Sequence, residues 1–406
     1  MTNEPSWLLL ALALALALAL AGTVLWLSMT EAHAVARRFP PGRGERHTDS
    51  TPRRRPPRST FGGSGGGEET RLQRAAIIVN PTKFTDLAKA RAEVEQVCSS
   101  QGWAEPLWLE TTADDPGPGQ TRRALDEGVD LICALGGDGT VRTVGSTLVG
   151  TGTAMGLLSA GTGNLLARNL KLPIDDLEQA LTVALTGRNA RIDTCMLTLT
   201  RPETTELLER ARDEDGPDEN VDLQDATDYP QPGSRSRTEE HVFLVMAGLG
   251  FDAEVMAGAP EGLKSKVGWP AYLVSGARHL RGPQFVVDFG TDDGTRFRRR
   301  VRSVVVGNVG RLQGGMVLMP EAKLDDGVID TVLLSPGGIV GWGAVVARLA
   351  TRKRRGHQRV DHYTSREISV SSHKPVEIQL DGDPLGMATE MKVVVNPSSL
   401  VVRQPT

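Results

Sequence analysis

Cysteine is scarce in this sequence. The 406 residues contain only Cys98, Cys133 and Cys195, which lie far apart and form no C-x-x-C pair. This pattern argues against a disulfide framework and against a cysteine-based zinc site. We therefore expect three buried thiols in a reducing compartment.

A large excess of charge of one sign is also lacking. The chain has 46 Lys and Arg against 50 Asp and Glu, a net charge of −4. A nucleic-acid-binding protein would be expected to carry a strongly basic domain or face, so this class is disfavoured. Aromatic residues make up only 4%, but 39% of the residues are hydrophobic, which supports a folded core and excludes a collagen-like chain. At roughly 150 residues per domain, this length predicts about two domains.

The N-terminus has no charged residue between Glu4 and Glu31. The apolar stretch 7–29 is long enough to span a hydrocarbon layer of roughly 30 Å as a helix, so residues 1–30 are expected to be a transmembrane anchor. A cleaved signal peptide is the alternative, suggested by the small residues around His33. It is disfavoured because the first five residues contain no Lys or Arg.

Residues 31–70 are rich in Arg, Pro, Gly and Ser and are expected to form a basic, disordered linker. By the positive-inside rule, arginines that follow the span place the rest of the chain in the cytoplasm. The same arginines would attract anionic lipid headgroups. We therefore expect a single-pass protein of the cell membrane whose folded part is cytoplasmic.

The folded part begins near residue 71 and alternates between two patterns. The segments expected as strand, helix, strand, helix and strand are 75–80, 86–101, 106–110, 121–127 and 131–135. This alternation predicts an α/β domain with a parallel sheet over 71–190.

Longer strand-like runs follow residue 191 and predict a second, β-rich domain over 191–390. These runs are 241–247, 284–289, 300–306, 328–334, 367–370 and 376–380. A polar, mainly acidic insertion at 201–240 is expected to be a disordered surface loop.

A glycine-rich turn between a strand-like and a helix-like segment is the most informative motif. The apolar run 131–135 is followed by Gly136-Gly137-Asp138-Gly139-Thr140 and then by the helix-compatible segment 141–148. Glycines let main-chain N–H groups approach an anion, and the helix that follows presents its positive end. The turn therefore fits a phosphate, although this stretch alone could be an ordinary strand-to-helix turn.

Two further loops favour the phosphate site. Gly161-Thr162-Gly163-Asn164 follows the strand-like run 154–158, and Asn80-Pro81-Thr82-Lys83 follows the first strand. Open α/β sheets bind ligands at the carboxyl ends of their strands, so the three loops predict a nucleotide site. The absence of G-x-x-x-x-G-K-[ST] excludes a P-loop protein. The absence of G-x-G-x-x-G after the first strand weakens a hydride-transfer dinucleotide fold.

Five motifs occur in a fixed order along the chain: Gly136–Thr140, Gly161–Asn164, Gly250-Phe251-Asp252, Lys323-Leu324-Asp325-Asp326-Gly327 and Asp381-Gly382-Asp383. In this order they resemble the catalytic family of the diacylglycerol kinases, which includes bacterial lipid kinases and the sphingosine and ceramide kinases. The resemblance covers about residues 71–406 without the acidic insertion.

The resemblance implies a kinase that uses ATP and Mg²⁺, with an ATP domain, a β-sandwich-like domain and an active site between them. The C-terminal tail 391–406 is expected to return to the ATP domain. The residues implied to hold ATP are Asn80, Pro81, Thr82, Lys83, Gly136, Gly137, Asp138, Gly139, Thr140, Gly161, Thr162, Gly163 and Asn164.

The resemblance also implies catalytic and metal-binding roles. Asp383 matches the general base, and Asp138 would act in the phosphate and magnesium network. Lys323, Asp326 and Val328 match a magnesium site that uses main-chain oxygens of the outer two and the carboxylate of Asp326.

Two positions depart from the family pattern. Asp383 stands where the family usually has glutamate, one methylene longer. Asn164-Leu165 stands where many bacterial members have Asn-Asp.

The function that follows is a membrane-tethered, ATP-dependent lipid kinase that transfers the γ-phosphoryl group to the hydroxyl of a diacylglycerol or sphingoid-like lipid. Its expected partners are the lipid substrate and an anionic membrane surface, with no nucleic acid. A soluble-metabolite kinase of the NAD-kinase type and a non-catalytic nucleotide-binding membrane protein are the alternatives. Without the other motifs, Asp381–Asp383 would be interpreted as a β-hairpin turn.

Overall fold

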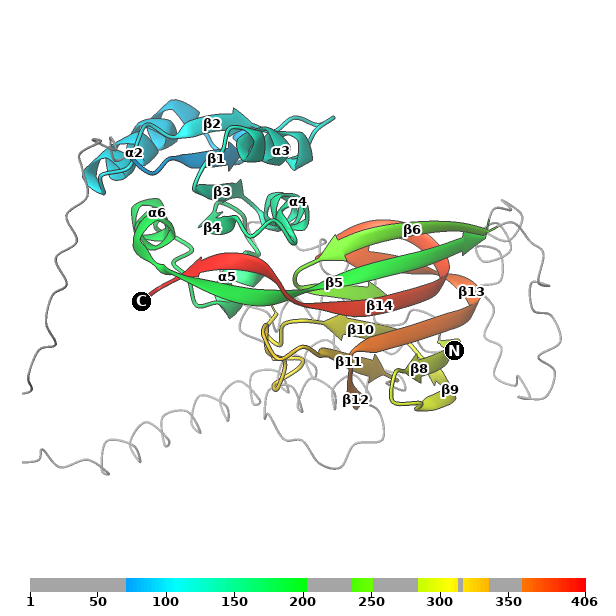
Figure 1. Ribbon diagram of the computed structural model, residues 1–406. Helices are drawn as coiled ribbons and strands as arrows, with labels where there is room; N and C mark the ends of the chain where they lie inside the picture. The colour runs from blue at the N-terminus through cyan, green and yellow to red at the C-terminus, as the bar shows by residue number, and fades with distance from the viewer. Residues whose placement is uncertain (1–70, 203–235, 251–283, 313–316, 336–359) are drawn as a thin grey trace, which may run out of the picture. The chain divides into compact units, whose positions relative to one another are not determined.

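The computed structural model describes residues 71–202, 236–250, 284–312, 317–335 and 360–406, which belong to one compact unit, 69–406 (Figure 1). The expected anchor 1–30, the linker 31–70 and most of the acidic insertion lie outside the described residues. Within the described ranges, no helix is long and apolar enough to cross a membrane.

A parallel sheet forms the first part of the fold. Its strands are β1 (Ala75–Val79), β2 (Leu107–Glu110), β3 (Leu131–Gly136) and β4 (Ala154–Ser159). They lie in the order β2-β1-β3-β4, and each neighbouring pair is parallel. Every residue of β1 and β3 is buried, as expected for apolar strands covered on both faces.

Helices cover both faces of this sheet (Figure 1). On one face, α2 (Leu87–Ser100) and α6 (Leu177–Thr186) pack against Ile77 of β1. On the other, Ile78 packs among residues of α3 (Pro118–Asp126), α4 (Asp138–Leu148) and α5 (Leu165–Asn169). Asp86 and Asp176 begin α2 and α6 by accepting a main-chain N–H three residues further on. The expected α/β domain is confirmed.

The remaining strands form a β-rich region, which is also confirmed. They are β5 (Arg188–Pro202), β6 (Ser236–Phe243), β7 (Met246–Leu249), β8 (Phe285–Thr291), β9 (Arg296–Val301), β10 (Ser303–Gly307), β11 (Ile329–Leu334), β12 (Val360–Ser365), β13 (Glu367–Leu380) and β14 (Asp383–Gln404). Their neighbours are antiparallel, except where the end of β14 pairs with β4 in parallel at Val401 and Val402. The C-terminal residues thereby extend the first sheet.

Several of the expected boundaries are wrong. The disordered insertion expected over 201–240 is too long, because residues 201–202 belong to β5 and residues 236–240 to β6, and these two strands pair with each other. The run 241–247 is divided between β6 and β7, because Asp381 binds the N–H groups of Val245 and Met246 where the chain changes partner. The run 300–306 is divided at Arg302, whose N–H donates to Leu334. The runs 367–370 and 376–380 are one strand, β13, with an irregularity in its pairing between them.

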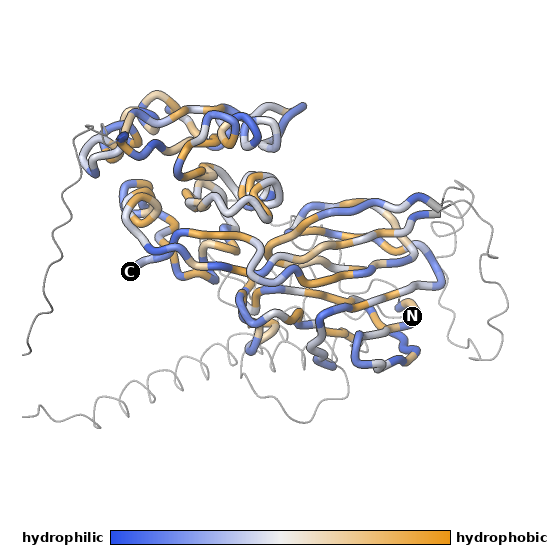
Figure 2. Tube along the Cα trace, viewed as in Figure 1, coloured by the Kyte–Doolittle hydropathy of each residue, from blue (hydrophilic) through white to orange (hydrophobic). Residues whose placement is uncertain are grey.

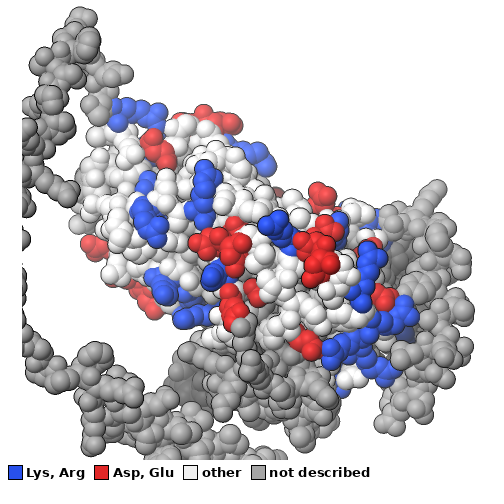
Figure 3. All heavy atoms as spheres, turned by 60° about the horizontal axis from the view of Figure 1, so that its bottom comes forward, with Lys and Arg blue, Asp and Glu red and all other residues white. Residues whose placement is uncertain are grey.

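Hydropathy follows this architecture. Figure 2 shows hydrophobic β1, β3 and β4, whereas β13 alternates, in agreement with its alternating burial. All three cysteines are buried, as expected. On the face in Figure 3, acidic and basic side chains are interspersed.

Candidate active site

Three loops meet at the carboxyl ends of β1, β3 and β4. The N–H of Ala160 donates to Gly136 O at 2.8 Å, and the N–H of Asn80 donates to Leu135 O at 3.0 Å. The structure therefore brings together the three segments that the sequence singles out, Asn80–Lys83, Gly136–Thr140 and Gly161–Asn164.

Glycine is required where two of these loops touch. A Cβ atom on Gly161 would lie 2.7 Å from the Cα of Gly137, which is closer than real contacts allow. A Cβ atom on Gly137 would make only ordinary contacts, one of them 3.8 Å from Lys83 Cε. The two backbones thus pass close to each other, with the Lys83 side chain beside them.

The polar side chains of the outer loop shape its backbone. Asn80 Oδ1 accepts two hydrogen bonds from Thr82, one from the main-chain N–H at 3.1 Å and one from the hydroxyl Oγ1 at 2.8 Å. Asn80 thereby caps the start of the 3-10 helix Pro81–Lys83. Thr140 is buried over Gly136, so its side chain is part of the packing beneath the loop.

Asp138 joins the two glycine loops through its carboxylate. Its Oδ2 accepts from the N–H of Asn164 at 2.8 Å, and its Oδ1 accepts from that of Leu165 at 2.7 Å. Burial raises the pKa of Asp138; the two N–H groups oppose this, and the charge of Asp383 adds to it. Asp138 therefore caps the start of α5 from the first turn of α4.

Asn164 adapts its backbone to this cap. It has a positive φ of 48°, and its side chain binds both the N–H and the carbonyl of Gly161. Leu165 contributes its N–H, while its side chain is buried in the core. Position 165 therefore contributes a main-chain N–H to the site and, being leucine, no carboxylate.

Asp381-Gly382-Asp383 forms a two-residue hairpin between β13 and β14. Leu380 pairs with Asp383, and the two residues between them have positive φ angles of 50° and 95°. Positive φ at both positions is typical of type I′ turns. The backbone is thus a β-hairpin turn, and the same turn carries Asp383.

Asp381 anchors the hairpin. Its Oδ1 accepts from the N–H groups of Val245 at 3.1 Å and Met246 at 2.8 Å, while its own N–H donates to Met246 O. Burial raises the pKa of this carboxyl to about 6, although Met246 N–H and the charge of Arg142 act in the opposite direction.

Asp383 lies beside the first turn of α4. Its Oδ2 is 3.6 Å from the position that a Cβ atom on Gly139 would take, and it accepts from Arg142 Nη2 at 2.7 Å. Arg142 Nη1 also donates to Leu380 O at 2.7 Å. The Asp383 side chain is 56% exposed, so its carboxylate is open to a ligand.

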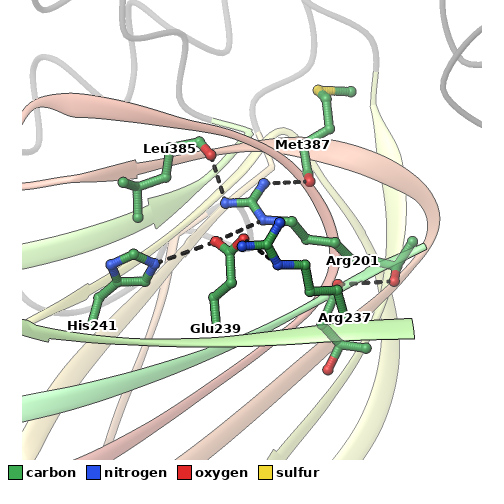
Figure 4. Close-up of polar contacts among 8 residues, drawn as sticks. Arg201, Arg237, Glu239, His241, Leu385 and Met387 are labelled. Carbon is green, nitrogen blue, oxygen red and sulfur yellow. Dashed lines mark hydrogen bonds and ion pairs between the residues drawn. The ribbon is translucent and has the colours of Figure 1, made fainter. Parts of the chain in front are cut away.

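A second arginine fixes the chain just after Asp383 (Figure 4). Arg201 donates to the carbonyls of Leu385 at 2.6 Å and Met387 at 2.8 Å, and to Glu239 Oε2 at 3.1 Å. This contact ties the start of β14 to β5 and β6.

The expected metal residues lie on a loop held by buried Asp193. Asp193 accepts from the N–H groups of Gly327 and Ser398, each at 2.7 Å, and its own N–H donates to Leu324 O. Lys323 and Asp326 are exposed and Val328 is half-buried. Within the loop, the N–H of Val328 donates to Asp326 Oδ1 at 3.3 Å, and hydrogen bonds among the described residues join the loop to Asp193 and not to Asp138 or Asp383.

This loop fits a hard divalent cation by its donors. The main-chain oxygens of Lys323 and Val328 and the carboxylate of Asp326 are the oxygen ligands that such a cation prefers. Burial and, secondarily, the nearby charge of Asp193 raise the pKa of Asp326, so a cation here would relieve carboxylate repulsion. Among the described residues, no group of three or more His, Cys, Asp or Glu side chains could hold a metal. Main-chain oxygens would therefore have to complete the set.

Sequence reasoning missed Arg142 and Asp193. Arg142 lies four residues after Asp138, so the two share a face of α4, which is a detectable signal. Asp193 is the single acidic residue of β5, but that strand also holds arginines, threonines and an asparagine, so its sequence gives no clear signal of a buried anchor.

Comparison with known families agrees with the five motifs. Residues 74–197 match the diacylglycerol kinase catalytic domain. Residues 244–404 match the YegS C-terminal NAD kinase beta sandwich-like domain. The two matches correspond to the α/β part and to most of the β-rich part.

Individual relatives cover most of the chain. A diacylglycerol kinase of Bacillus subtilis (strain 168) is 25% identical over 326 residues, 78% of this chain and 91% of the relative. One of Staphylococcus aureus (strain JH9) is 24% identical over 315 residues, 77% of this chain and 86% of the relative. A crystal structure of a diacylglycerol kinase from Bacillus anthracis str. Sterne covers 83% of this chain and 98% of its own, with 19% identity and a TM-score of 0.58, and so shares the fold. Residues 74–197 thus match the catalytic domain of the diacylglycerol kinases, and relatives that span most of the chain carry the name diacylglycerol kinase.

Proposed function

We propose that the protein is an ATP-dependent lipid kinase that transfers the γ-phosphoryl group of ATP to a lipid hydroxyl, with a diacylglycerol or a sphingoid-like lipid as acceptor. One observation carries the proposal. An exposed carboxylate, Asp383, lies against the first turn of α4, at the loop suited to bind phosphate. The family supports a kinase; the acceptor is the part that we propose.

Phosphate binding would fall to main-chain groups. The backbone of Gly137 and Gly161 and the N-terminus of α4 offer N–H groups and a positive helix end to an anion. Lys83, beside Gly137, would neutralise part of the charge. Lys323, Asp326 and Val328 would hold Mg²⁺, which would supply further neutralisation of phosphate charge.

Asp383 would serve as the general base. It would accept the proton of the lipid hydroxyl as that oxygen forms a bond to the γ-phosphorus, while the bond from the γ-phosphorus to the β,γ-bridging oxygen breaks and ADP leaves. Asp138 would act indirectly, because both of its oxygens accept main-chain N–H groups that fix the two loops.

A membrane location would suit this chemistry. The apolar segment 7–29 and the arginines of 31–70 support a single-pass anchor with the catalytic part in the cytoplasm, near anionic headgroups. Tethering would raise the effective concentration of the enzyme at a two-dimensional substrate.

The test is phosphoryl transfer by the full-length chain in phosphatidylcholine vesicles with radiolabelled ATP. Separate vesicles would carry a diacylglycerol, a sphingoid base or a total lipid extract, and NAD would be offered in solution. We expect a labelled lipid in at least one vesicle reaction and about 1,000-fold slower labelling with Asp383→Asn. Labelling of NAD but of no lipid would overturn the proposal in favour of a metabolite kinase, and no labelling in any reaction would favour a non-catalytic nucleotide-binding protein.

A further inference from the structure

Arg142 connects the phosphate loop to the hairpin that carries Asp383. We propose that Arg142 is a positioning residue for this reaction, holding the Asp383 carboxylate over Gly139 at the start of α4. The inference rests on the proposed function, because it concerns how the general base is presented to the acceptor.

Two hydrogen bonds define the orientation. Arg142 Nη2 donates to Asp383 Oδ2, and Nη1 donates to Leu380 O, each at 2.7 Å. One planar guanidinium therefore binds the base and the strand that leads into its hairpin in a fixed geometry, which the flexible ammonium of a lysine would not provide. The Arg142 side chain is only 17% exposed, whereas that of Asp383 is 56% exposed. The cation is thus fixed by packing, and the carboxylate that it holds stays open.

Electrostatics explains why a cation is needed here. Asp138 and Asp383 lie close enough that the charge of Asp383 contributes to raising the pKa of Asp138. Two neighbouring carboxylates repel each other, and the exposed one is free to move away. Arg142 projects from the same helix as Asp138, one turn further on, and offsets this repulsion at Asp383.

The length of the side chain gives a second reason. Aspartate reaches one methylene less far from its backbone than glutamate does. Asp383 can reach the phosphate loop only if the hairpin lies close to α4, and the bond from Arg142 to Leu380 O joins β13 to that helix. The Asp383 carboxylate is 3.6 Å from the position of a Cβ atom on Gly139, an ordinary contact distance that places it beside the first turn of α4.

The experiment is a double-mutant cycle with the full-length chain in phosphatidylcholine vesicles that carry the acceptor lipid. The variants are Arg142→Ala, Arg142→Lys, Asp383→Asn and Arg142→Ala/Asp383→Asn. We expect Arg142→Ala to lower kcat about 100-fold, the cost of a small misplacement of a reacting group, and to change KM for ATP less than about 3-fold. Arg142→Lys should recover about 10-fold, because an ammonium retains the charge but not the two-point geometry.

The cycle separates positioning from general destabilisation. In the Asp383→Asn background, Arg142→Ala should lower kcat by less than about 2-fold, since the group that it positions is already gone. Arg91→Ala is the matched control: Arg91 makes an ion pair with Glu95 on helix α2, away from the hairpin, and its loss should leave kcat unchanged. If Arg142→Ala does not fold, Arg142→Lys takes its place in the cycle.

Distinct outcomes would overturn the two claims. The role of Arg142 would be overturned if the wild-type chain phosphorylates lipid and Arg142→Ala leaves kcat unchanged. It would also be overturned if Arg142→Ala lowers kcat equally in the wild-type and Asp383→Asn backgrounds. Either result would leave the proposed lipid kinase activity intact. A wild-type chain that labels no lipid would overturn the proposed function, and the inference with it.

Discussion

The loop that begins α4 and the hairpin between β13 and β14 both combine aspartate with glycine, but they use their carboxylates differently. In the loop, Asp138 is the lone carboxylate, and both of its oxygens bind N–H groups of the next glycine loop. In the hairpin, Asp381 has the corresponding structural role, binding Val245 and Met246 N–H. Only the hairpin has a second carboxylate, Asp383, which is exposed.

The difference separates two kinds of aspartate in glycine-rich motifs. Asp138, Asp381 and Asp193 each accept two main-chain N–H groups and thereby fix a segment that is distant in the sequence. Among the described residues, no main-chain N–H donates to Asp383, which is held by a side chain and would thus be available for proton transfer. Substitution of an aspartate that binds main-chain N–H groups should therefore change stability, whereas substitution of the exposed Asp383 should change activity.

The largest effect is expected at Asp383. Asp383→Asn removes the proton acceptor, and kcat for lipid phosphorylation should fall about 1,000-fold. Because the side chain is exposed, the free energy of unfolding should change by less than about 0.5 kcal/mol. Vesicle assays and urea unfolding of the same preparation measure both. A variant as active as wild type would remove Asp383 from the reaction and end the contrast.

At Asp138, in contrast, a large change in stability is expected. Asp138→Asn turns an amide NH₂ toward one of the two N–H groups and should lower the free energy of unfolding by about 3 kcal/mol, with weaker ATP binding. Urea unfolding and nucleotide titration measure these effects. Asp86→Asn is the control, because asparagine caps a helix as well as aspartate and α2 should be unaffected. Unchanged stability of Asp138→Asn would contradict the structural role of Asp138.

The pH dependence of stability sharpens the contrast within the hairpin. Burial raises the pKa of folded Asp381 to about 6 from a reference of 3.8, so its stabilising contribution is complete below about pH 4 and is lost as the pH rises through 6. Asp381→Asn keeps an oxygen acceptor for both N–H groups and carries no charge. The difference in the free energy of unfolding between Asp381→Asn and wild type should therefore shift in favour of the variant by about 2 to 3 kcal/mol from pH 4 to pH 7. Urea unfolding at the two pH values measures this shift. A pH-independent difference would mean that Asp381 does not titrate in this range.

The smallest effect concerns the two loops themselves. Gly161→Ala would place a methyl group against the Cα of Gly137, and should cost about 2 kcal/mol of stability and weaken ATP binding. Gly137→Ala meets only ordinary contacts and should leave stability unchanged while still obstructing the phosphate. Thermal unfolding with and without ATP distinguishes the two. Equal destabilisation by both would show that the close approach is not between these glycines.

Much of this architecture could be predicted because its signals are local. Fully apolar strands, N-caps such as Asp86 and glycine turns after strands arise from interactions within a few residues. The strand break at Val245 could not be predicted, since the acceptor that causes it lies 135 or 136 residues further along the chain. Likewise, Asp193 and the loop that it anchors are separated by 134 residues.

By itself, the sequence determined the α/β and β-rich regions, the order of the five motifs and the chemistry that their residue types allow. Only the tertiary structure decided which aspartates hold the backbone and which one is exposed. It also decided that Arg142 meets Asp383 across 241 residues. The physical reason is that burial and hydrogen-bond partners, which set the role of a carboxylate, come from segments that chain folding brings together and that residue spacing does not specify.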